Sequence, residues 1–533
     1  MSRLHHLLGP LVLGGLHGLC YAPGLFPGAA LPWLQLLLLT GIAYLLWGQS
    51  RLFPSWHLGF AFGLGTFLTG TSWIYISLHE FAYMAALLAL SAVIVLAMFL
   101  SLFYAVATSL SRHFFPQPTR TPWRTVLSFA GIWAALEWLR GNLFTGFPWL
   151  NIGYAHVDGP LQGWAPLLGV YGLALAAALT AATIAMWLLC RKTGPRAHWL
   201  LVLPALLLGV GTLSSARQWV EPNGKPLEVR LVQANIRPDM KFDPAQIWTD
   251  MDAHRQLASQ PRVGGAADFT LLPETTIPVF QDQLSTEAWQ AWITSASVAG
   301  GPLALGLATR LQLTEDDRRF YNSVLLFDET STVESLTQAE GLARYDKQHL
   351  VPFGEFIPPG FRWFVDAMIM PLGDFNRGPA RQSPFLIADQ RIAMNICYED
   401  VFGEELLPAI RPVNGDPGAS ILANVSNLGW FGNTLALPQH LQMARMRVLE
   451  TGRPMLRATN TGMTAIIAAD GSVQSQLPAL SVGVLDGVVQ GTQGLTPYTR
   501  TGNLLFLLIT LPLLVLPLWR RPRPARDGKP VDS

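Results

Sequence analysis

Seven apolar segments fill the first 215 residues of this chain, and an eighth follows near its end. They lie near residues 7–22, 27–48, 57–77, 84–110, 126–139, 161–190, 198–215 and 504–519. Most approach the roughly 20 residues that a helix needs to cross the hydrocarbon core of a bilayer. Only 13% of the 533 residues are charged, about half the usual share in a soluble protein. The sequence therefore predicts a polytopic α-helical membrane domain.

The charges between these segments predict which side of the membrane each loop occupies. If the N-terminus lies inside the cell, the short outer loops hold only Arg140. The inner loops and the tail then hold Arg3, Arg51, Arg112, Arg120, Arg124, Arg191, Lys192, Arg196, Arg520, Arg521, Arg523, Arg526 and Lys529. Because inner loops are enriched in Lys and Arg, we expect eight spans with both termini cytoplasmic. The protein would then lie in a cell inner membrane, with residues 218–497 on the periplasmic side.

Three domains are expected: a seven-span domain (1–217), an exported domain (218–497), and an eighth span with a basic tail (498–533). The exported domain alternates strand-like and helix-like segments. We expect strands over 227–236, 269–272, 302–308, 323–327, 391–396, 419–424 and 464–469, and helices over 286–299 and 438–451. This alternation predicts an α/β domain with polar groups gathered at one rim of the sheet. Short linkers, 214–225 and 491–502, would join it to the spans.

Seven packed spans beside a globular domain are also compatible with a transporter that carries a sensor. Transport pathways usually place ionisable groups within the membrane. Here His17, His57 and Glu137 are the main exceptions in otherwise apolar spans. The net charge of +1, with no basic cluster outside the tail, gives no indication of nucleic-acid binding. An enzyme is favoured.

Cys397 is the one cysteine of the exported domain, since Cys20 and Cys190 lie in predicted spans. It has no disulfide partner within that domain, and an unpaired thiol in an oxidising compartment suggests a functional use. It follows an apolar strand, at a junction that would expose its side chain above the sheet. A lone cysteine is also often a small buried apolar residue. Its position alone leaves both interpretations open.

Two loops bounded by Pro and Gly supply groups that could activate this thiol. Leu-Pro-Glu-Thr-Thr-Ile-Pro holds Glu274, and Asp-Lys-Gln-His-Leu-Val-Pro-Phe-Gly-Glu holds Lys347 and Glu355. Singly, each could be a solvated loop charge. Together they supply a carboxylate to take the thiol proton and an ammonium to hold an oxyanion. The backbone N–H of Tyr398 would be a second oxyanion donor.

Histidine or metal chemistry has less support. A papain-like site needs a histidine, and only His440 among the histidines of the exported domain follows Cys397. His440 lies in a helical stretch, where a structural role is expected. No His, Cys and Asp cluster has the spacing of a metal site, so we expect no metal.

These three segments together resemble the Glu–Lys–Cys triad of the nitrilase, or carbon–nitrogen hydrolase, superfamily over about residues 227–490. By this resemblance Glu274 is the general base, Lys347 the family lysine and Cys397 the nucleophile. Two later stretches, Asn-Val-Ser-Asn-Leu-Gly-Trp-Phe-Gly and Gln-His-Leu-Gln-Met-Ala-Arg, also match. The resemblance implies a nitrilase-like α-β-β-α sandwich.

With its eight predicted spans, nearly the whole chain resembles the apolipoprotein N-acyltransferases. Gly-Phe-Pro-Trp-Leu after the fifth span and Gln-Ala-Asn-Ile at the start of the exported domain add to this. By resemblance, Glu355 would support Lys347, while Tyr398 and Glu399 would shape the site. The family often has Trp where this chain has Phe242, which keeps an aromatic ring but loses the indole hydrogen bond.

The resemblance implies N-acylation of the N-terminal diacylglyceryl-cysteine of an apolipoprotein, the last step of lipoprotein maturation. A phospholipid, expected to be phosphatidylethanolamine, would acylate Cys397, and the α-amine would then take the acyl group in a ping-pong reaction. No cofactor is required, because the thioester stores the activation. A monomer is expected, because eight spans can bury their own polar groups. The main rival is a membrane-tethered nitrilase-type amidohydrolase; a degenerate binding module would make all three triad residues accidental.

The segment 358–377 is unusually apolar for a loop between catalytic elements. Its Trp, Phe and Met residues suit a membrane interface, so we predict a mobile arm or lid that dips toward lipid. A short core helix is the alternative. Trp149, Phe242 and Trp430 are candidate lipid contacts, with core packing an equal alternative for Trp149 and Trp430.

Overall fold

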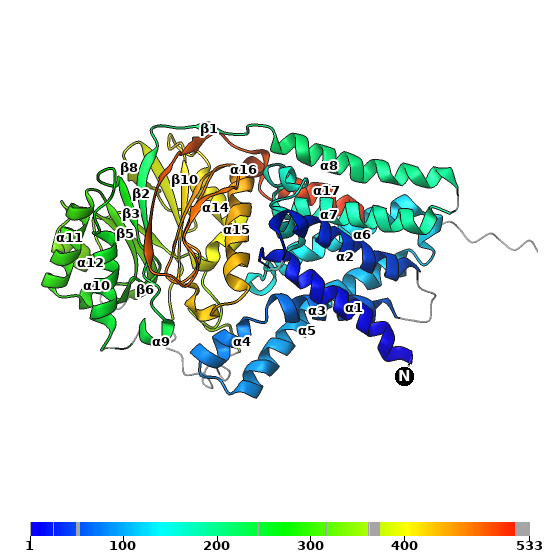
Figure 1. The fold of residues 1–533 in the computed structure, drawn as a ribbon, viewed down its shortest axis with the longest axis horizontal. Coiled ribbons are helices and arrows are strands. Elements are labelled where there is room, and N and C mark those ends of the chain that lie inside the picture. Colours follow the sequence, from blue (N-terminus) through cyan, green and yellow to red (C-terminus); the bar gives the residue numbers. More distant parts are fainter. Residues whose placement is uncertain are drawn as a thin grey trace, which may run out of the picture.

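The computed structural model shows two bodies side by side, a bundle of apolar helices and a layered α/β body (Figure 1). It describes residues 2–24, 26–48, 54–192, 194–241, 243, 245–312, 314, 317–360, 362 and 374–516.

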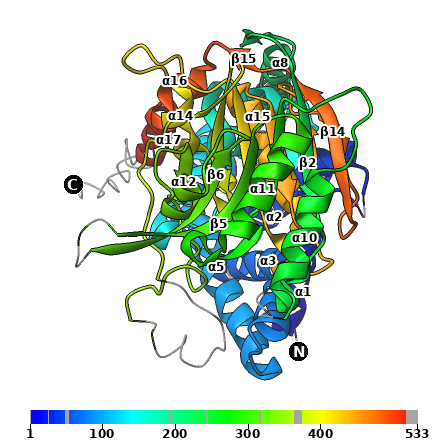
Figure 2. The same ribbon diagram turned by 90° about the vertical axis from the view of Figure 1, so that its left-hand side faces the viewer.

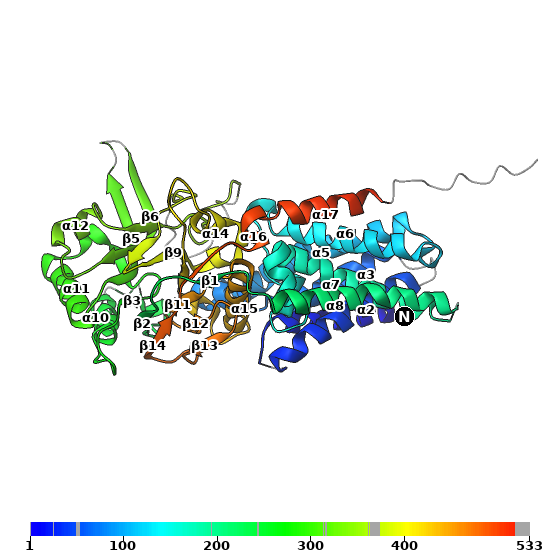
Figure 3. The ribbon, with the colours of Figure 1, turned by 90° about the horizontal axis from the view of Figure 1, so that it is seen from above.

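Each of the eight apolar segments contains a helix. These are α1 (Ser2–Gly18), α2 (Leu31–Gly48), α3 (Ser55–Gly70), α5 (Ala86–Phe114), α6 (Pro122–Arg140), α7 (Ala165–Cys190), α8 (Val202–Ser215) and α17 (Leu504–Val515). In the part of the chain that the structure describes, four stretches are long and apolar enough to cross a membrane: 28–48, 86–114, 162–190 and 195–215. Two shorter apolar helices cover 7–21 and 504–515. The view from above shows this bundle beside the α/β body, with α17 along one side (Figure 3).

The third apolar segment ends earlier than the sequence predicts. We expected it to reach residue 77, whereas α3 ends at Gly70 and a short α4 (Ile74–Ile76) and a π-helical turn, η3 (Ser77–Phe81), precede α5. The Trp73 indole donates to the Gly70 carbonyl, which occupies one of the carbonyl groups left open at a helix C-terminus.

Two sheets form the centre of the α/β body. The first has the order β14-β2-β3-β5-β6-β7, with β4 beside β5. Its strands are β14 (Gly483–Val489), β2 (Leu227–Gln233), β3 (Phe269–Leu271), β5 (Leu303–Gln312), β6 (Arg318–Phe327), β7 (Arg344–Asp346) and β4 (Ile277–Phe280). The second has the order β13-β12-β11-β10-β9-β8: β13 (Val473–Gln476), β12 (Ala465–Ile467), β11 (Met455–Thr459), β10 (Ile421–Ser426), β9 (Gln390–Ile396) and β8 (Phe385–Ile387).

Three apolar cores hold four layers together. The middle core joins the sheets, with Val229 and Leu271 from the first packed with Ile396 and Val425 from the second. An outer core packs α10 (Ile247–Ala258), α11 (Thr286–Ala299) and α12 (Val333–Gln338) on the first sheet, and these helices face the viewer in Figure 2. The other packs α14 (Gly403–Ile410) and α15 (Ala436–Thr451) on the second. The predicted α-β-β-α sandwich is confirmed.

Strand direction gathers several loops at one rim. β2, β3 and β5 are parallel, as are β9, β10 and β11. β7 runs parallel to β5, because each is antiparallel to β6. The loops after β3, β7, β9 and β10 therefore leave from the carboxyl ends of their strands, where ligands of open α/β sheets usually bind.

The two predicted linkers are more ordered than the sequence suggests. β1 (Glu221–Pro222) pairs antiparallel with β15 (Thr492–Gln493), so the segments that enter and leave the α/β body form a small sheet. The second linker also contains the short helix α16 (Pro497–Thr501). Pairing between segments about 270 residues apart in sequence has no local signature.

Candidate active site

Cys397 lies directly after β9, as the first residue of a 3-10 turn, η10 (Cys397–Val401). Its φ of 54° lies in the left-handed region, which non-glycine residues rarely adopt and which costs about 1–3 kcal/mol. The Asn424 side chain donates to the Cys397 carbonyl at 3.1 Å and to Asn395 Oδ1 at 2.6 Å. These bonds hold the turn in a conformation that presents a partly buried thiol at the rim.

Glu399 ties this turn to the loop after β7. Its carboxylate is buried and accepts the Ile396 N–H at 2.6 Å on one oxygen. It also accepts the N–H groups of Gln348 at 2.6 Å and His349 at 3.0 Å, and the Tyr345 hydroxyl at 2.9 Å. Burial raises the pKa of Glu399, against the lowering effect of these N–H donors and of the nearby lysine. Glu399 therefore connects the cysteine turn to the lysine loop.

Lys347 begins the loop after β7 and is almost fully buried. Its Nζ lies 2.9 Å from Glu355 Oε1 and 3.5 Å from Glu274 Oε1. Burial alone would lower the pKa of Lys347, but the carboxylates of Glu355 and Glu274 outweigh it and raise the pKa above its ordinary value. The ammonium is therefore charged throughout the neutral range.

Glu274 follows β3, in a turn that lies directly over Gly306 of β5. A Cβ at Gly306 would approach the Glu274 Cα to 2.7 Å, so only glycine fits beneath this turn. The Glu274 carboxylate accepts the Asn427 N–H at 3.0 Å on its second oxygen. The Lys241 ammonium donates to the Glu274 carbonyl at 3.0 Å. The candidate base is thus held by segments from both sheets.

The cysteine is in its thiol form at rest. Burial, and next the Glu274 carboxylate, raise the pKa of Cys397 well above its ordinary value, against the lowering effect of Lys347. A thiol beside a carboxylate and a permanent ammonium is an arrangement for proton removal during nucleophilic attack. Tyr398 N–H lies in the first turn of η10, where backbone N–H groups lack partners within the helix.

The structure brings Glu274, Lys347, Glu355, Cys397 and Glu399 together at one rim. Tyr398 projects toward the helix bundle, where its hydroxyl donates to the Gly146 carbonyl at 3.3 Å. Among the described residues, no group of three or more His, Cys, Asp or Glu side chains could hold a metal ion.

The three candidate lipid contacts differ in their surroundings. Trp149 is 1% exposed and its indole N–H donates to Gln439 Oε1 at 2.7 Å, which favours the packing interpretation. Trp430, in the turn after β10, is partly exposed and meets Phe81 edge to face at 5.9 Å. Phe242 lies outside the described residues, as do 361 and 363–373 of the predicted lid.

Behind the cysteine turn lies a buried ionic cluster without access to solvent. Arg457 donates to Asp400 Oδ2 at 2.8 Å and to His440 Nδ1. Burial lowers the pKa of His440, and the neighbouring Arg457 lowers it further. His440 is therefore neutral, which agrees with the structural role predicted for it.

Two residues near the catalytic candidates were missed in the sequence. Asn322 Nδ2 donates to Glu274 Oε1 at 2.9 Å and to Glu355 Oε1 at 2.7 Å. Lys241 is buried next to the Glu274 turn, and burial lowers its pKa to about 8 against the effect of Glu274. Asn322 lies in the middle of β6 and Lys241 ends the short helix α9 (Pro238–Lys241), and neither position carries a local sequence signal for a site.

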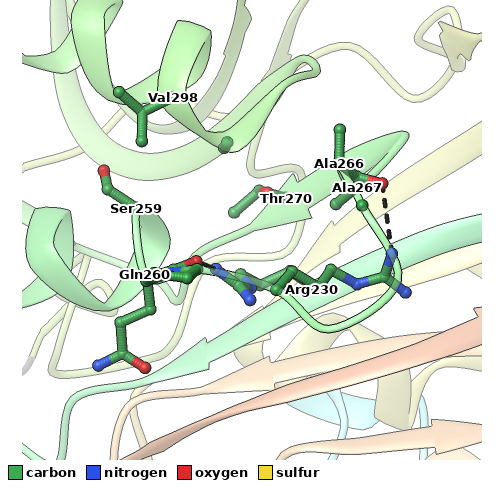
Figure 4. A pocket seen from close by; sticks show the side chains of 11 residues that line it. Arg230, Ser259, Gln260, Ala266, Ala267, Thr270 and Val298 are labelled. Carbon is green, nitrogen blue, oxygen red and sulfur yellow. Dashed lines mark hydrogen bonds between the residues drawn. The ribbon is translucent and has the colours of Figure 1, made fainter.

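A cavity of about 330 Å³ lies elsewhere in the α/β body and is lined by none of these residues. Figure 4 shows Arg230 reaching along it toward Gln260. Arg230 is already paired with Asp486 at 2.8 Å, and Arg262 with Glu228. The two arginines that line this cavity are thus paired with carboxylates, and Cys397 does not line it.

Comparison with protein families gives two matches that together cover most of the chain. Residues 13–183 match the family described as the apolipoprotein N-acyltransferase N-terminal domain, and residues 228–497 match carbon–nitrogen hydrolase. An amidase from Nesterenkonia sp. has a similar solved structure, with 18% identity and a TM-score of 0.35 over 53% of this chain and 95% of that one. The two family matches define a carbon–nitrogen hydrolase domain joined to a bundle of apolar helices.

Curated relatives narrow this class. The apolipoprotein N-acyltransferase of Bordetella bronchiseptica is 48% identical over 96% of both chains. That of Ralstonia nicotianae is 43% identical over 96% of this chain and 93% of its own. This chain belongs to the apolipoprotein N-acyltransferase family.

Proposed function

We propose that this protein transfers an acyl group from a phospholipid to the N-terminal diacylglyceryl-cysteine of apolipoproteins, through a thioester on Cys397. The observation that carries the proposal is the rim itself. Lys347 Nζ lies 2.9 Å from Glu355 Oε1 and 3.5 Å from Glu274 Oε1. The same cluster of loops holds Cys397, whose partly buried thiol is carried on a left-handed backbone. Two relatives that are named as acyltransferases and cover 96% of this chain favour acyl transfer over simple hydrolysis.

The first half-reaction loads the enzyme. Glu274 takes the Cys397 proton as the sulfur attacks an ester carbonyl of the phospholipid, and a tetrahedral oxyanion forms. Lys347 and the Tyr398 N–H donate to this oxyanion. As the intermediate collapses, the carbon–oxygen bond breaks and the lysophospholipid alkoxide takes the proton from Glu274.

The second half-reaction transfers the acyl group. The free α-amine attacks the thioester carbonyl, and Glu274 takes a proton from the nitrogen. The same donors hold the second oxyanion. Collapse breaks the carbon–sulfur bond, Cys397 regains its proton from Glu274, and an amide leaves. The protons balance over the cycle, and the thioester supplies the activation.

The remaining features of the proposal concern the surroundings of the site. The membrane part, 1–217 with the eighth span in 498–533, would anchor the enzyme in the cell inner membrane with both termini cytoplasmic. Residues 218–497 would then face the periplasm, where both lipid substrates can reach the rim. Phosphatidylethanolamine is the proposed donor, a monomer is the proposed active form, and 358–377 is the proposed lid.

Intact-mass measurement tests the thioester directly. The purified full chain is incubated with phosphatidylethanolamine vesicles, and wild type should gain one fatty-acyl mass that hydroxylamine removes. Cys397→Ala should gain none, and Glu274→Gln should load far more slowly. An unmodified wild type, or an acylated Cys397→Ala, would contradict the mechanism.

A second measurement separates acyl transfer from hydrolysis. The loaded enzyme is mixed with a diacylated lipopeptide whose α-amine is free, and with the same lipopeptide N-acetylated as a matched control. Discharge should be faster with the free amine and should yield the amide. Equal discharge in both would support the amidohydrolase alternative.

A further inference from the structure

The helix α15 lies between the second sheet and the apolar helices, as Figure 1 shows. Several of its side chains bond to the helix bundle or its loops. Gln442 Nε2 donates to the Tyr154 carbonyl at 3.1 Å, and Glu450 Oε1 accepts the Val170 N–H at 2.7 Å. α15 is therefore the main polar connection between the catalytic body and the membrane part.

Gln439 makes the densest of these connections. It is 1% exposed, and its Oε1 accepts both the Trp149 indole N–H at 2.7 Å and the Trp73 indole N–H at 3.2 Å. Its Nε2 donates to the Gly70 carbonyl, at the end of α3, at 3.0 Å. One amide thus joins two loops of the bundle that lie far apart in sequence.

One of those loops lies against the residue that follows the nucleophile. The Trp149 ring is nearly parallel to the Tyr398 ring, at 15° and 6.4 Å between centroids. The Arg140 guanidinium donates to the Phe147 and Trp149 carbonyls at 2.6 Å each, so the backbone of this loop is held as well. Gln439 thus holds the indole N–H of Trp149, and Arg140 holds the backbone of the loop that carries Trp149.

The cysteine turn does not need these contacts to keep its own shape. Asn424 and Glu399, which hold Cys397, belong to the α/β body. What the contacts at Gln439 determine is where that body sits on the bundle. A reaction with a lipid that lies in the bilayer depends on this placement, whereas a small water-soluble reagent does not.

We propose that Gln439 is a positioning residue that keeps Cys397 at a fixed height relative to the membrane part, so that the ester of a membrane-bound phospholipid reaches the thiol. The inference rests on the proposed function and deepens it. Displacements of about 1 Å at a reacting centre can slow a reaction on the order of 100-fold. Loss of the Gln439 contacts is therefore expected to act on the lipid reaction and to spare the intrinsic reactivity of the thiol.

The test compares two reactions of the same thiol in the full-length chain. The Gln439→Met variant keeps a side chain of similar length but leaves both indole N–H groups and the Gly70 carbonyl without this partner. Its acylation by phosphatidylethanolamine vesicles should fall by about tenfold or more. Its alkylation at Cys397 by iodoacetamide, read by intact mass against Cys397→Ala, should stay within about twofold of wild type.

Two further variants control for simple loss of packing. Gln442→Met removes the hydrogen bond that a buried side-chain amide of the same helix donates to the Tyr154 carbonyl, without touching the loop at Trp149, and its acylation should fall clearly less than that of Gln439→Met. Trp149→Phe removes the indole donor, and the double variant Gln439→Met/Trp149→Phe should lose less than the product of the two single losses. Thermal unfolding of every variant is measured in the same detergent.

Three results would overturn the inference: equal losses of acylation and alkylation in Gln439→Met, unchanged acylation in that variant, or an equal loss in Gln442→Met. Failure of the proposed function looks different, since wild type itself would then gain no acyl mass from the vesicles while still reacting with iodoacetamide.

Discussion

Two buried charge clusters in this molecule are built differently. In the helix bundle, Glu137 and Arg140 on α6 form a 2.5 Å ion pair, and the Tyr104 hydroxyl donates to the same carboxylate at 3.0 Å. At the rim, one ammonium, Lys347, faces two carboxylates. The first cluster is one cation against one anion. The second keeps an excess negative charge beside a thiol.

This difference in charge balance indicates that the first cluster stabilises the fold, whereas the second can take part in a reaction. In the matched pair, Arg140 Nη2 faces Glu137 and Nη1 donates to the Phe147 and Trp149 carbonyls, so this pair holds a loop in place. An unmatched carboxylate beside a thiol can take a proton. Glu137, one of the ionisable exceptions noted in the apolar segments, thus belongs to a pair that holds a loop in place.

The largest effect is expected at the rim. Lys347→Met removes an oxyanion donor and leaves Glu274 and Glu355 facing each other without a cation, so acylation of Cys397 should fall by about 10³-fold or more. Single-turnover intact mass with phospholipid vesicles measures it. Lys225→Met, at an exposed site, is the matched control and should match wild type. A fully active Lys347→Met enzyme would show that the rim is not the site.

Breaking the Glu137–Arg140 pair should lower the stability of the folded protein. Arg140→Met leaves Glu137 buried without its cation, which is expected to destabilise the fold by about 3–5 kcal/mol. Thermal unfolding in detergent measures this loss. Glu137→Gln/Arg140→Met removes both charges and should recover part of it. If Arg140→Met instead unfolded at the wild-type temperature and lost only acylation of Cys397, the contrast between the two clusters would be wrong.

A smaller effect is expected at Asn322, which donates to both rim carboxylates. Asn322→Leu keeps the volume but removes both donors, and hydrogen bonds to charged groups are each worth about 1.5–3 kcal/mol. Acylation should fall about tenfold to a hundredfold, and the unfolding temperature should also fall, because two buried carboxylates each lose a donor. Asn322→Asp adds a third carboxylate and should be slower still. A variant as fast as wild type would remove Asn322 from the site.

The smallest effect is expected in the pH dependence of Cys397 alkylation. Burial and the Glu274 carboxylate raise the pKa of Cys397 above its ordinary value of 9.0, so the reactive thiolate is scarce at neutral pH and grows as pH rises. Iodoacetamide alkylation of Cys397 should therefore keep increasing through pH 9 without a plateau. Glu274→Gln removes a charge that raises this pKa, and its profile should move to lower pH. A wild-type plateau near neutral pH would indicate a preformed thiolate and exclude general-base activation.

Local patterns in the chain predict much of this protein. Runs of about 20 apolar residues can only be stable as helices that bury their own backbone groups, and all eight segments contain helices. Glu274, Lys347 and Cys397 each follow a strand in a short motif. Parallel strands bring such loops to one rim, so their convergence also follows from the strand pattern.

Other contacts could not be predicted, because they join distant segments through unremarkable residues. Asn322 is one polar residue in the middle of β6, and its place at the site depends on two carboxylates from separate loops. As an aromatic residue, Trp149 was a candidate lipid contact. In the fold, its indole N–H donates to Gln439, which lies 290 residues later in the sequence, and Trp149 is buried.

The sequence by itself determined the bundle of apolar helices and an α/β domain, because hydrophobic periodicity acts over short distances. The sandwich and the three residues proposed for catalysis followed from the resemblance of local motifs to the nitrilase superfamily. The tertiary structure decided what surrounds them: the pair of carboxylates around Lys347, the β1–β15 pairing and the Gln439 contacts. Buried polar groups take whichever partners the packed layers bring within about 3 Å, and that choice exists only once the chain has folded.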